Sequence, residues 1–410
     1  MEIHSERAKE LDAFISSNPQ IKIGEWPLEI DGVVQRHPFY RLPISQLRYN
    51  VNNGRLAMEI REWENVHGRS LDANDPDDAK AIRSLLLSLG ETDTDLLKED
   101  LRLKGQIEPG VITHDGFVIN GNRRMAILEL LHEEEPTGKW KTLEAIRLPP
   151  SVGDKNLWKI EAGLQLSKDK IAEYHPVNEL LKIKQGIDRE LEPNEIAAAM
   201  YGRTVDEVKL AIERLELIDQ FLDFFGQHEN YGLIKKFGLH EHFIDIQKAI
   251  LATAKNKGLS GREIKKRLNG TFALIRADIL LRPNQQKGKK KRVTHWDIRE
   301  LGKVYADGDA EAEFLKILEP AMKEPKKITS IKPEIILESF KSAKEILENK
   351  EDRDQPVKLI ERAIKALESI DQSNKHLGDE RVISALERLY KMVTTLSNKI
   401  NQNYDKNQPR

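Results

Sequence analysis

The sequence predicts an α+β N-terminal domain, followed by an all-α domain with a helix-turn-helix and by a C-terminal helical region. Short β-rich runs separated by turn residues are confined to the first part of the chain, up to about Leu148. Beyond that point, apolar residues recur with the spacing of amphipathic helices. One run without any apolar residue, PNQQKGKKKR, interrupts the helical part and is typical of a linker.

These patterns divide the 410 residues into five segments. Residues 1–37 are expected to form an N-terminal extension, and residues 38–160 the α+β domain. Residues 161–282 are helical and contain the helix-turn-helix, and residues 283–292 form the basic linker. Residues 293–410 end in three amphipathic helices, which favour a helical bundle or a dimerising hairpin and hence a homodimer.

The composition excludes several classes of protein and of site. Charged residues make up 33% of the chain, with 66 Lys plus Arg against 68 Asp plus Glu, so any basic surface for a polyanion must be local. The absence of cysteine excludes disulfides, thiolate metal sites and cysteine nucleophiles. No stretch approaches the ~20 apolar residues of a membrane helix, and the N-terminus lacks an apolar targeting segment. We therefore expect a soluble, cytoplasmic protein without a membrane partner.

The most informative stretch is GQIEPGVITHDGFVINGNRRMAILELL, which begins at Gly105. Gly105 ends a helical run, and Pro109 prevents that helix from resuming. Two short β-rich runs then follow, separated by Asp-Gly, which is a hairpin-turn signal. An amphipathic run comes next, so we expect a helix with Asn122 as its N-cap and with Arg123 and Arg124 in its first turn.

The position of these two arginines indicates an anion. The backbone N–H groups and the positive dipole end of a helix N-terminus attract anions. Cationic side chains oppose the dipole there, so a ligand explains them better than helix stability does, and phosphate is the natural candidate. An ordinary pair of surface arginines is the alternative interpretation.

The order of GQIEP, a hairpin and GNRRMA resembles the nucleotide-binding core of the ParB and sulfiredoxin-like superfamily. ParB members of that superfamily carry G-Q-x-x-P and then G-E-R-R-x-x-A. Upstream, LPISQLRYNVNNGR at residues 42–55 looks like the opening strand and the I-P-x-x-x-L-x-x-N segment of the family. The resemblance continues to about Phe225 and so covers a little over half of the chain. Sulfiredoxin chemistry is excluded because the chain has no cysteine.

The resemblance implies a divergent ParB/sulfiredoxin-like domain that binds a nucleoside triphosphate, CTP or ATP, with Mg²⁺. In ParB proteins a single helix usually fills the interval before the G-Q-x-x-P motif, so residues 56–93 resemble an insertion here. Such an insertion either covers the ligand site or decorates the periphery. The residues that match the nucleotide-binding motifs are Gly105, Gln106, Pro109, Gly121, Asn122, Arg123 and Arg124.

A third family motif, E-N-x-Q-R, helps ParB proteins to bind metal and triphosphate. When Gln165 is aligned with the glutamine of that motif, Ala162 and Gly163 replace Glu-Asn, and Leu166 replaces the arginine. Glu161 then stands one residue early and is the candidate catalytic and metal-binding residue. The missing Asn and Arg weaken the case for magnesium coordination, CTP specificity and hydrolysis. Asn122 likewise stands where the family has glutamate.

The run EPNEIAAAMYGRTVDEVKLAIERLELI has a helix-turn-helix pattern and resembles the E-x-A-x-x-x-G-x-S-x-x-x-V segment of the family. Its second helix begins with Asp206 and Glu207, which would face DNA phosphates, so sequence-specific reading is disfavoured. The candidate DNA-contacting residues are Arg203, Lys209, Lys265, Lys266, Lys289, Lys290, Lys291 and Arg292. For Lys265 and Lys266 the alternative interpretation is a solvated helix face. For Lys289, Lys290, Lys291 and Arg292 it is a flexible tether.

Three functions compete at this point. The first is a DNA-associated protein with a ParB-like nucleotide pocket. The second is an enzyme that uses the same pocket, because ParB-like folds also include NTPases, a kinase and nucleases of plasmid and antiphage systems; plasmid partition and antiphage defence are the corresponding pathways. The third is a scaffold that has kept the fold, lost nucleotide turnover and binds DNA or a partner protein.

Overall fold

The computed structural model describes residues 4–136, 138–166, 174–282, 293–321, 328–351 and 355–406. The chain divides into two units, Met1–Lys344 and Glu345–Arg410. The boundaries that the sequence suggests near residues 160 and 282 therefore lie inside the first unit.

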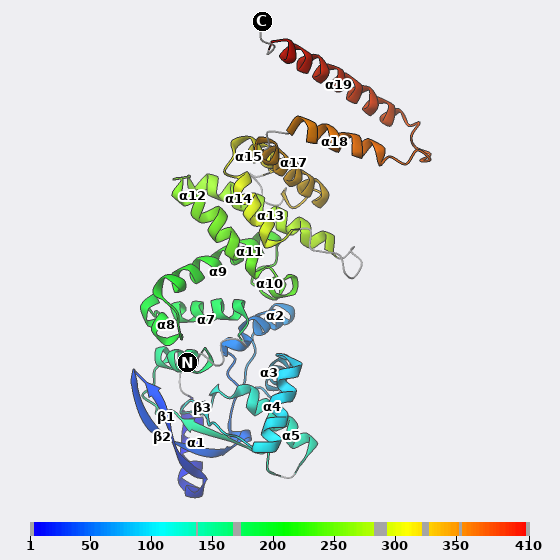
Figure 1. Ribbon diagram of the computed structural model, residues 1–410. Coiled ribbons are helices and arrows are strands. Elements are labelled where there is room, and N and C mark those ends of the chain that lie inside the picture. Colours follow the sequence, from blue (N-terminus) through cyan, green and yellow to red (C-terminus); the bar gives the residue numbers. More distant parts are fainter. Residues whose placement is uncertain are drawn as a thin grey trace. The chain divides into compact units, whose positions relative to one another are not determined.

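One mixed sheet organises the N-terminal part of the first unit, in agreement with the predicted α+β class (Figure 1). Its strands, in spatial order, are β1 (Lys22–Ile30), β2 (Val33–Pro43), β5 (Thr142–Arg147), β3 (Gly110–Ile112) and β4 (Val118–Asn120). Neighbouring strands are antiparallel except β3 and β5, which are parallel. The segment predicted as an extension thus contributes β1 and much of β2 to the sheet.

Two Asp-Gly turns close the hairpins of this sheet. Asp31 and Gly32 join β1 to β2 with φ values of 54° and 76°, the positive values that a tight two-residue hairpin loop needs. Asp115 and Gly116 lie in the predicted turn between β3 and β4, where Gly116 has a φ of 88°. The predicted hairpin of the central stretch is therefore confirmed.

Both faces of the sheet are covered by helices. Successive strand residues, such as Val111 and Ile112, belong to two different hydrophobic clusters, because their side chains point to opposite faces of the sheet. One cluster includes apolar residues of α1, α3 and α5, whereas the other includes Leu157 and Ile160 of α6. The helices of this part are α1 (Ser5–Ser17), α2 (Ala57–His67), α3 (Pro76–Ser88), α4 (Glu91–Lys104), α5 (Asn122–Glu134) and α6 (Asp154–Gln165).

The predicted helix-turn-helix is present as α8 (Pro193–Ala199) and α9 (Val205–Phe225). Thr204 and Glu207 form a capping box that starts α9, because each side chain satisfies a backbone N–H of the other residue. The helix α7 (Pro176–Asp188) packs against both. The second helix extends beyond Ile218, where the helix-turn-helix run of the sequence ends, since Phe221 and Leu222 continue its buried face.

The remainder of the described chain is helical, as the periodicity predicts. The elements are α10 (Gly232–Phe237), α11 (His240–Asp245), a π-helix (Ile246–Ala252), α12 (Thr253–Asn256), α13 (Gly261–Leu281), α14 (His295–Val304), α15 (Gly308–Lys316), α17 (Pro333–Glu351), α18 (Gln355–Glu368) and α19 (Glu380–Lys406). Short 3-10 helices occur at Pro19–Ile21, Ile44–Gln46, Gly54–Leu56 and Glu319–Ala321. No helix in the described ranges combines the length and the apolar character needed to cross a membrane.

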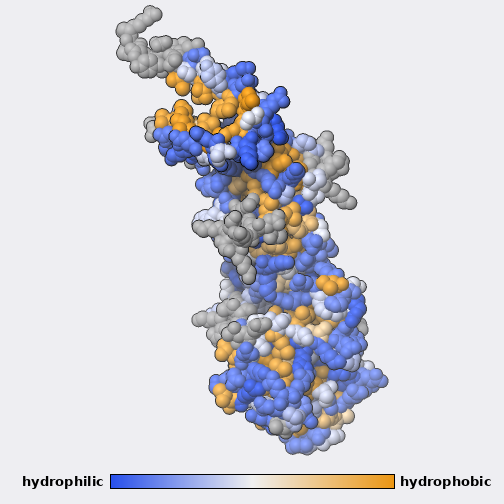
Figure 2. All heavy atoms as spheres, turned by 90° about the vertical axis from the view of Figure 1, so that its right-hand side faces the viewer, coloured by the Kyte–Doolittle hydropathy of each residue, from blue (hydrophilic) through white to orange (hydrophobic). Residues whose placement is uncertain are grey.

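The second unit exposes large hydrophobic side chains on α18 and α19 (Figure 2). Their spacing alternates between three and four residues, which is the pattern of a coiled-coil seam. The exposed seam residues are Val357, Ile360, Ile364 and Leu367 on α18, and Ile383, Leu386, Tyr390, Val393 and Ile400 on α19. These helices therefore carry apolar faces that are exposed to a large extent.

Candidate functional site

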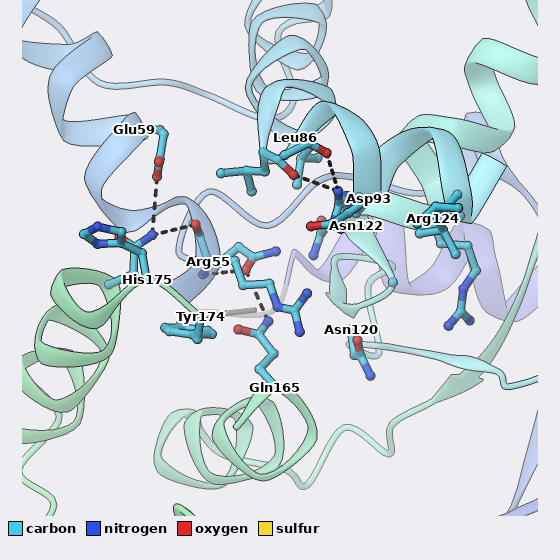
Figure 3. A pocket seen from close by; sticks show the side chains of 18 of the residues that line it. Arg55, Glu59, Leu86, Asp93, Asn120, Asn122, Arg124, Gln165, Tyr174 and His175 are labelled. Atoms are coloured by element: carbon cyan, nitrogen blue, oxygen red, sulfur yellow. Dashed lines mark hydrogen bonds between the residues drawn. The ribbon is translucent and has the colours of Figure 1, made fainter. Parts of the chain in front are cut away.

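A pocket of about 780 Å³ lies within the first unit (Figure 3), and its volume falls in the range of small-molecule sites. Four separate parts of the chain build it. They are the segment around Asn53 to Glu59, the corner between α3 and α4, the corner between β4 and α5, and the end of α6 with the start of α7. The last part contributes Gln165, Tyr174, His175, Pro176 and Asn178. Lys235 of α10 completes the lining.

The segment predicted as an insertion forms one wall of this pocket. Glu59 of α2, Leu86 of α3, and Leu89 and Gly90 at the following corner all line the pocket. Part of the segment 56–93 therefore lines the pocket. Leu86 and Leu89, together with Leu97 of α4, give this wall an apolar surface.

Three helices begin at the pocket. Their N-caps are Gly90 for α4, Gly121 for α5 and His175 for α7, and all three residues line the cavity. The helix α4 carries the carboxylate of Asp93 in its own first turn, whereas the first turn of α5 contains no acidic residue. The N-terminus of α5 therefore retains the positive dipole end and first-turn N–H groups that attract anions.

The prediction that Asn122 caps α5 is wrong, because Gly121 occupies the N-cap position. Gly121 has a φ of 111°, which strongly favours glycine. Asn122 is buried in the first turn, where its Oδ1 accepts from the Asn50 N–H at 3.0 Å and its Nδ2 donates to the Val118 carbonyl at 2.6 Å. Asn122 therefore ties the segment before the pocket to the start of α5.

Arg123 joins the start of α5 to the opposite wall. Its Nη2 donates to the carbonyl oxygens of Leu89 at 2.7 Å and Gly90 at 3.0 Å, and to the hydroxyl of Thr94 at 2.9 Å. Both predicted arginines lie in the first turn of α5 and line the pocket. The Arg123 guanidinium holds the corner between α3 and α4 beside a site suited to anions.

Arg124 connects the two predicted motifs to each other. Its Nη1 donates to the Glu108 carbonyl, which also accepts from Gln106 Nε2 at 3.1 Å. Burial lowers the pKa of the Arg124 guanidinium. In Figure 3 Arg124 lies at the margin of the view, away from Arg55 and Gln165.

The predicted residues of GQIEP support the site from outside. Gln106 accepts from the Glu144 N–H at 3.0 Å and donates to the Glu144 carbonyl, so it fixes this turn to β5. Gly105 is the C-cap of α4, as predicted, with a φ of 72°. The described residues that line the pocket do not include Gly105, Gln106 or Pro109.

Glu161, the candidate catalytic and metal-binding residue, is part of a buried ion pair. Its Oε2 lies 2.8 Å from Lys182 Nζ, and its Oε1 accepts from the Gly54 N–H at 3.0 Å and from Gln165 Nε2 at 3.1 Å. Glu161 is 4% exposed and Lys182 is 1% exposed, and burial lowers the pKa of Lys182. Both carboxylate oxygens are engaged within the protein, so this geometry gives Glu161 a structural role.

Within the described ranges, no three carboxylate or imidazole side chains lie close enough together to hold a metal ion. The pocket carboxylates are also engaged or separate. Glu59 forms an ion pair with Lys235 at 3.0 Å, and Asp93 lies over the N-cap Gly90.

Sequence reasoning missed several pocket residues, namely Arg55, Tyr174, His175 and Lys235. Arg55 closes the LPISQLRYNVNNGR segment, so the resemblance of that segment to the family could have indicated it. Lys235 comes from a distant helix, and no local pattern in the sequence connects it with the pocket.

The predicted DNA-contacting cations do not form one free basic surface. Arg203 pairs with Glu179 at 2.5 Å and Lys266 with Glu319 at 2.5 Å, whereas Lys209 and Lys265 are exposed. Lys289, Lys290, Lys291 and Arg292 lie outside the described residues. On α13, Lys266 and Arg267 are thus paired with carboxylates, the latter with Glu311 at 2.7 Å.

Comparisons of the chain with protein-family models, with curated proteins and with solved structures found no match.

The buried ion pair makes a prediction about stability. Lys182→Met leaves the Glu161 carboxylate buried without its cation, so the free energy of unfolding should fall by about 3–5 kcal/mol. Adding Glu161→Gln removes the charge but keeps an acceptor for Gly54, so the double variant should be more stable than Lys182→Met alone. Urea unfolding of the wild type, Lys182→Met and the double variant measures these free energies.

Lys184→Met is the matched control, because this lysine of α7 forms a surface ion pair with Asp188, and loss of such a pair should change stability little. Equal stability of wild type and Lys182→Met would contradict the buried pair.

Proposed function

We propose that this chain is a ParB-like nucleotide-binding, DNA-associated protein. Its pocket would hold the phosphates of a nucleoside triphosphate, CTP or ATP, at the start of α5. The observation that carries the proposal is that the GNRR motif opens α5 into a pocket of about 780 Å³ that Arg55 and the start of α7 also line. The family-like order of the motifs agrees with this placement.

The pocket offers different chemistry to different parts of a nucleotide. First-turn N–H groups of α5 and the guanidinium groups of Arg55 and Arg123 suit phosphate oxygens. The apolar wall of Leu86, Leu89 and Leu97 suits a base or a sugar face. Phosphate at this position would compete with the carbonyl oxygens of Leu89 and Gly90 for Arg123, and so would act on the corner between α3 and α4.

Binding is favoured over turnover in this proposal. The residues around the expected metal position do not fit Mg²⁺, because Glu161 is occupied by Lys182, Gly54 and Gln165. The Asn and Arg of the family motif are also missing. An NTPase, kinase or nuclease of plasmid or antiphage systems would need a carboxylate free to act in the pocket, and no specific observation favours one.

The proposal predicts nucleotide binding that depends on the pocket arginines. Isothermal titration with CTP, ATP, GTP and UTP should detect binding of at least one of them. Arg55→Gln and Arg123→Gln should each weaken that binding about tenfold or more, because charge-assisted hydrogen bonds contribute about 1.5–3 kcal/mol. Lys265→Gln is the charge-matched control, since Lys265 is exposed on α13, outside the pocket lining.

Circular dichroism verifies that each of these variants is folded. Failure of the folded wild-type protein to bind any of the four nucleotides would overturn the proposed function.

The DNA-binding part of the proposal rests on the helix pair α8 and α9 and on the exposed Lys209 and Lys265. Phosphate contacts release counterions, so the affinity for duplex DNA should fall steeply as salt increases. Lys209→Gln and Lys265→Gln should each reduce the slope of log K against log salt by about 1. Asp206 and Glu207 at the start of α9 predict little discrimination between unrelated duplexes.

Fluorescence anisotropy over a range of salt concentrations measures these slopes. Absence of DNA binding at low salt, or binding that salt does not weaken, would favour a protein-only scaffold.

We also propose that α18 and α19 pair with those of a second copy. Their flanking charges are of both signs, for example Glu387 with Arg388 on α19, which fits self-association better than binding to a polyanion. Leu386→Asp places a charge in the apolar seam and should shift a dimer to monomer in analytical ultracentrifugation. Thr395→Asp, on the opposite face of α19, should leave the dimer intact. A wild-type monomer at high concentration would contradict the pairing.

A further inference from the structure

The turn of the helix-turn-helix carries a cation that a neighbouring helix holds. Arg203 lies between α8 and α9, directly before Thr204, the N-cap of α9. Its Nη2 lies 2.5 Å from Oε1 of Glu179 in α7, a helix that packs against both α8 and α9 (Figure 1). The carboxylate of Glu207 is more distant, at 3.9 Å from Arg203 Nη1. The Arg203 guanidinium is therefore directed toward α7.

Arg203 occupies a place in the turn that is suited to a DNA phosphate. In helix-turn-helix proteins the start of the second helix enters the major groove, and polar groups beside it position the protein on the DNA backbone. A guanidinium can bind a phosphate there through charge-assisted hydrogen bonds. Arg203 is the only cationic residue of the run from Gly202 to Val208, in which Asp206 and Glu207 are acidic. Its pairing with Glu179 thus removes the positive charge nearest in sequence to the start of α9.

The geometry of this ion pair allows a phosphate to compete for Arg203. The side chain of Arg203 is 31% exposed and that of Glu179 is 16% exposed, and ion pairs that are open to solvent contribute little to stability. Glu179 also has a second cation beside it. Burial lowers the pKa of the Arg214 guanidinium on α9, and the nearby charge of Glu179 opposes this effect. Glu179 therefore keeps a cationic neighbour when Arg203 leaves it.

We propose that Glu179 masks Arg203 from DNA and thereby lowers the affinity of the helix-turn-helix for DNA. A DNA phosphate and the Glu179 carboxylate compete for the same guanidinium, so a population with Arg203 released binds DNA more tightly. This inference rests on the proposed DNA binding, because masking has an effect only if α8 and α9 meet DNA. The alternative role of the pair is a structural connection between α7 and the turn.

The first test removes the charge of Glu179 and keeps its shape. Glu179→Gln should bind duplex DNA about tenfold more tightly than wild type at low salt, because the released guanidinium gains a charge-assisted hydrogen bond to phosphate. The slope of log K against log salt should steepen by about 1, since one more phosphate is neutralised. Fluorescence anisotropy measures both quantities.

Asp188→Asn is the matched control for this test. Asp188 is also a carboxylate of α7, and it pairs with Lys184 at 2.8 Å. Its removal takes the same charge from the same helix without releasing Arg203, so the affinity and the slope should stay as in wild type.

Arg203→Gln distinguishes masking from a general loss of negative charge. In the wild-type background it should change DNA affinity by less than about twofold, because Arg203 is already masked, and in Glu179→Gln it should abolish the gain. An equal gain from Glu179→Gln with and without Arg203 would overturn the inference, since the carboxylate would then act only through its long-range field. A large loss of affinity in Arg203→Gln alone would also overturn it, because Arg203 would already contact DNA.

Circular dichroism verifies that the variants are folded, and thermal unfolding measures the structural role of the pair. A lower unfolding temperature of Glu179→Gln with unchanged DNA affinity would show a structural connection and overturn the masking, while the proposed DNA binding stands. If neither wild type nor Glu179→Gln binds DNA at low salt, the proposed DNA binding fails as well, so the two failures are distinguishable.

Discussion

The pocket depends on the buried carboxylate of Glu161. Its two oxygens connect Gly54 before α2, Gln165 at the end of α6 and Lys182 in α7, which are three of the segments that surround the cavity. This arrangement stabilises the geometry, because removing Lys182 would leave a buried carboxylate unpaired, and removing either neutral donor would cost it a hydrogen bond. The residue that the sequence suggests as catalytic is the residue that positions the pocket.

A second set of hydrogen bonds joins the two family-like motifs. Gln106 fixes the turn of GQIEP to β5, and the Glu108 carbonyl in that turn receives Arg124 of α5. Arg123, the next residue on the same helix, reaches the corner between α3 and α4. GQIEP and Arg124 therefore hold α5 in place, whereas Arg123 contacts the opposite wall of the pocket.

Much of the fold could be predicted from local signals. Asp115 and Gly116 indicate the hairpin, Gly105 the end of α4, and Thr204 with Glu207 the start of α9, because turns and caps depend on nearby residues. The capping role of Asn122 could not be predicted in this way, since its side chain is drawn to Asn50, which is distant in sequence. Gly121 occupies the N-cap position with a positive φ and has no capping side chain that the sequence could reveal.

The site was harder to predict because it is assembled from distant segments. The stretch from GQIEP to GNRR carries its own local pattern, whereas Tyr174 and Lys235 reach the pocket through the packing of α7 and α10. The ion pairs of Arg203 and Lys266 were equally hidden, because Glu179 and Glu319 lie far from them along the chain. Charge and periodicity indicate which residues are available, and only tertiary packing decides which of them meet.

A crystal structure of the protein soaked with CTP and with ATP tests the central claim most directly. The account predicts triphosphate density within hydrogen-bonding distance of the first-turn N–H groups of α5. Nucleotide bound elsewhere, or bound with its phosphates away from α5, would contradict it.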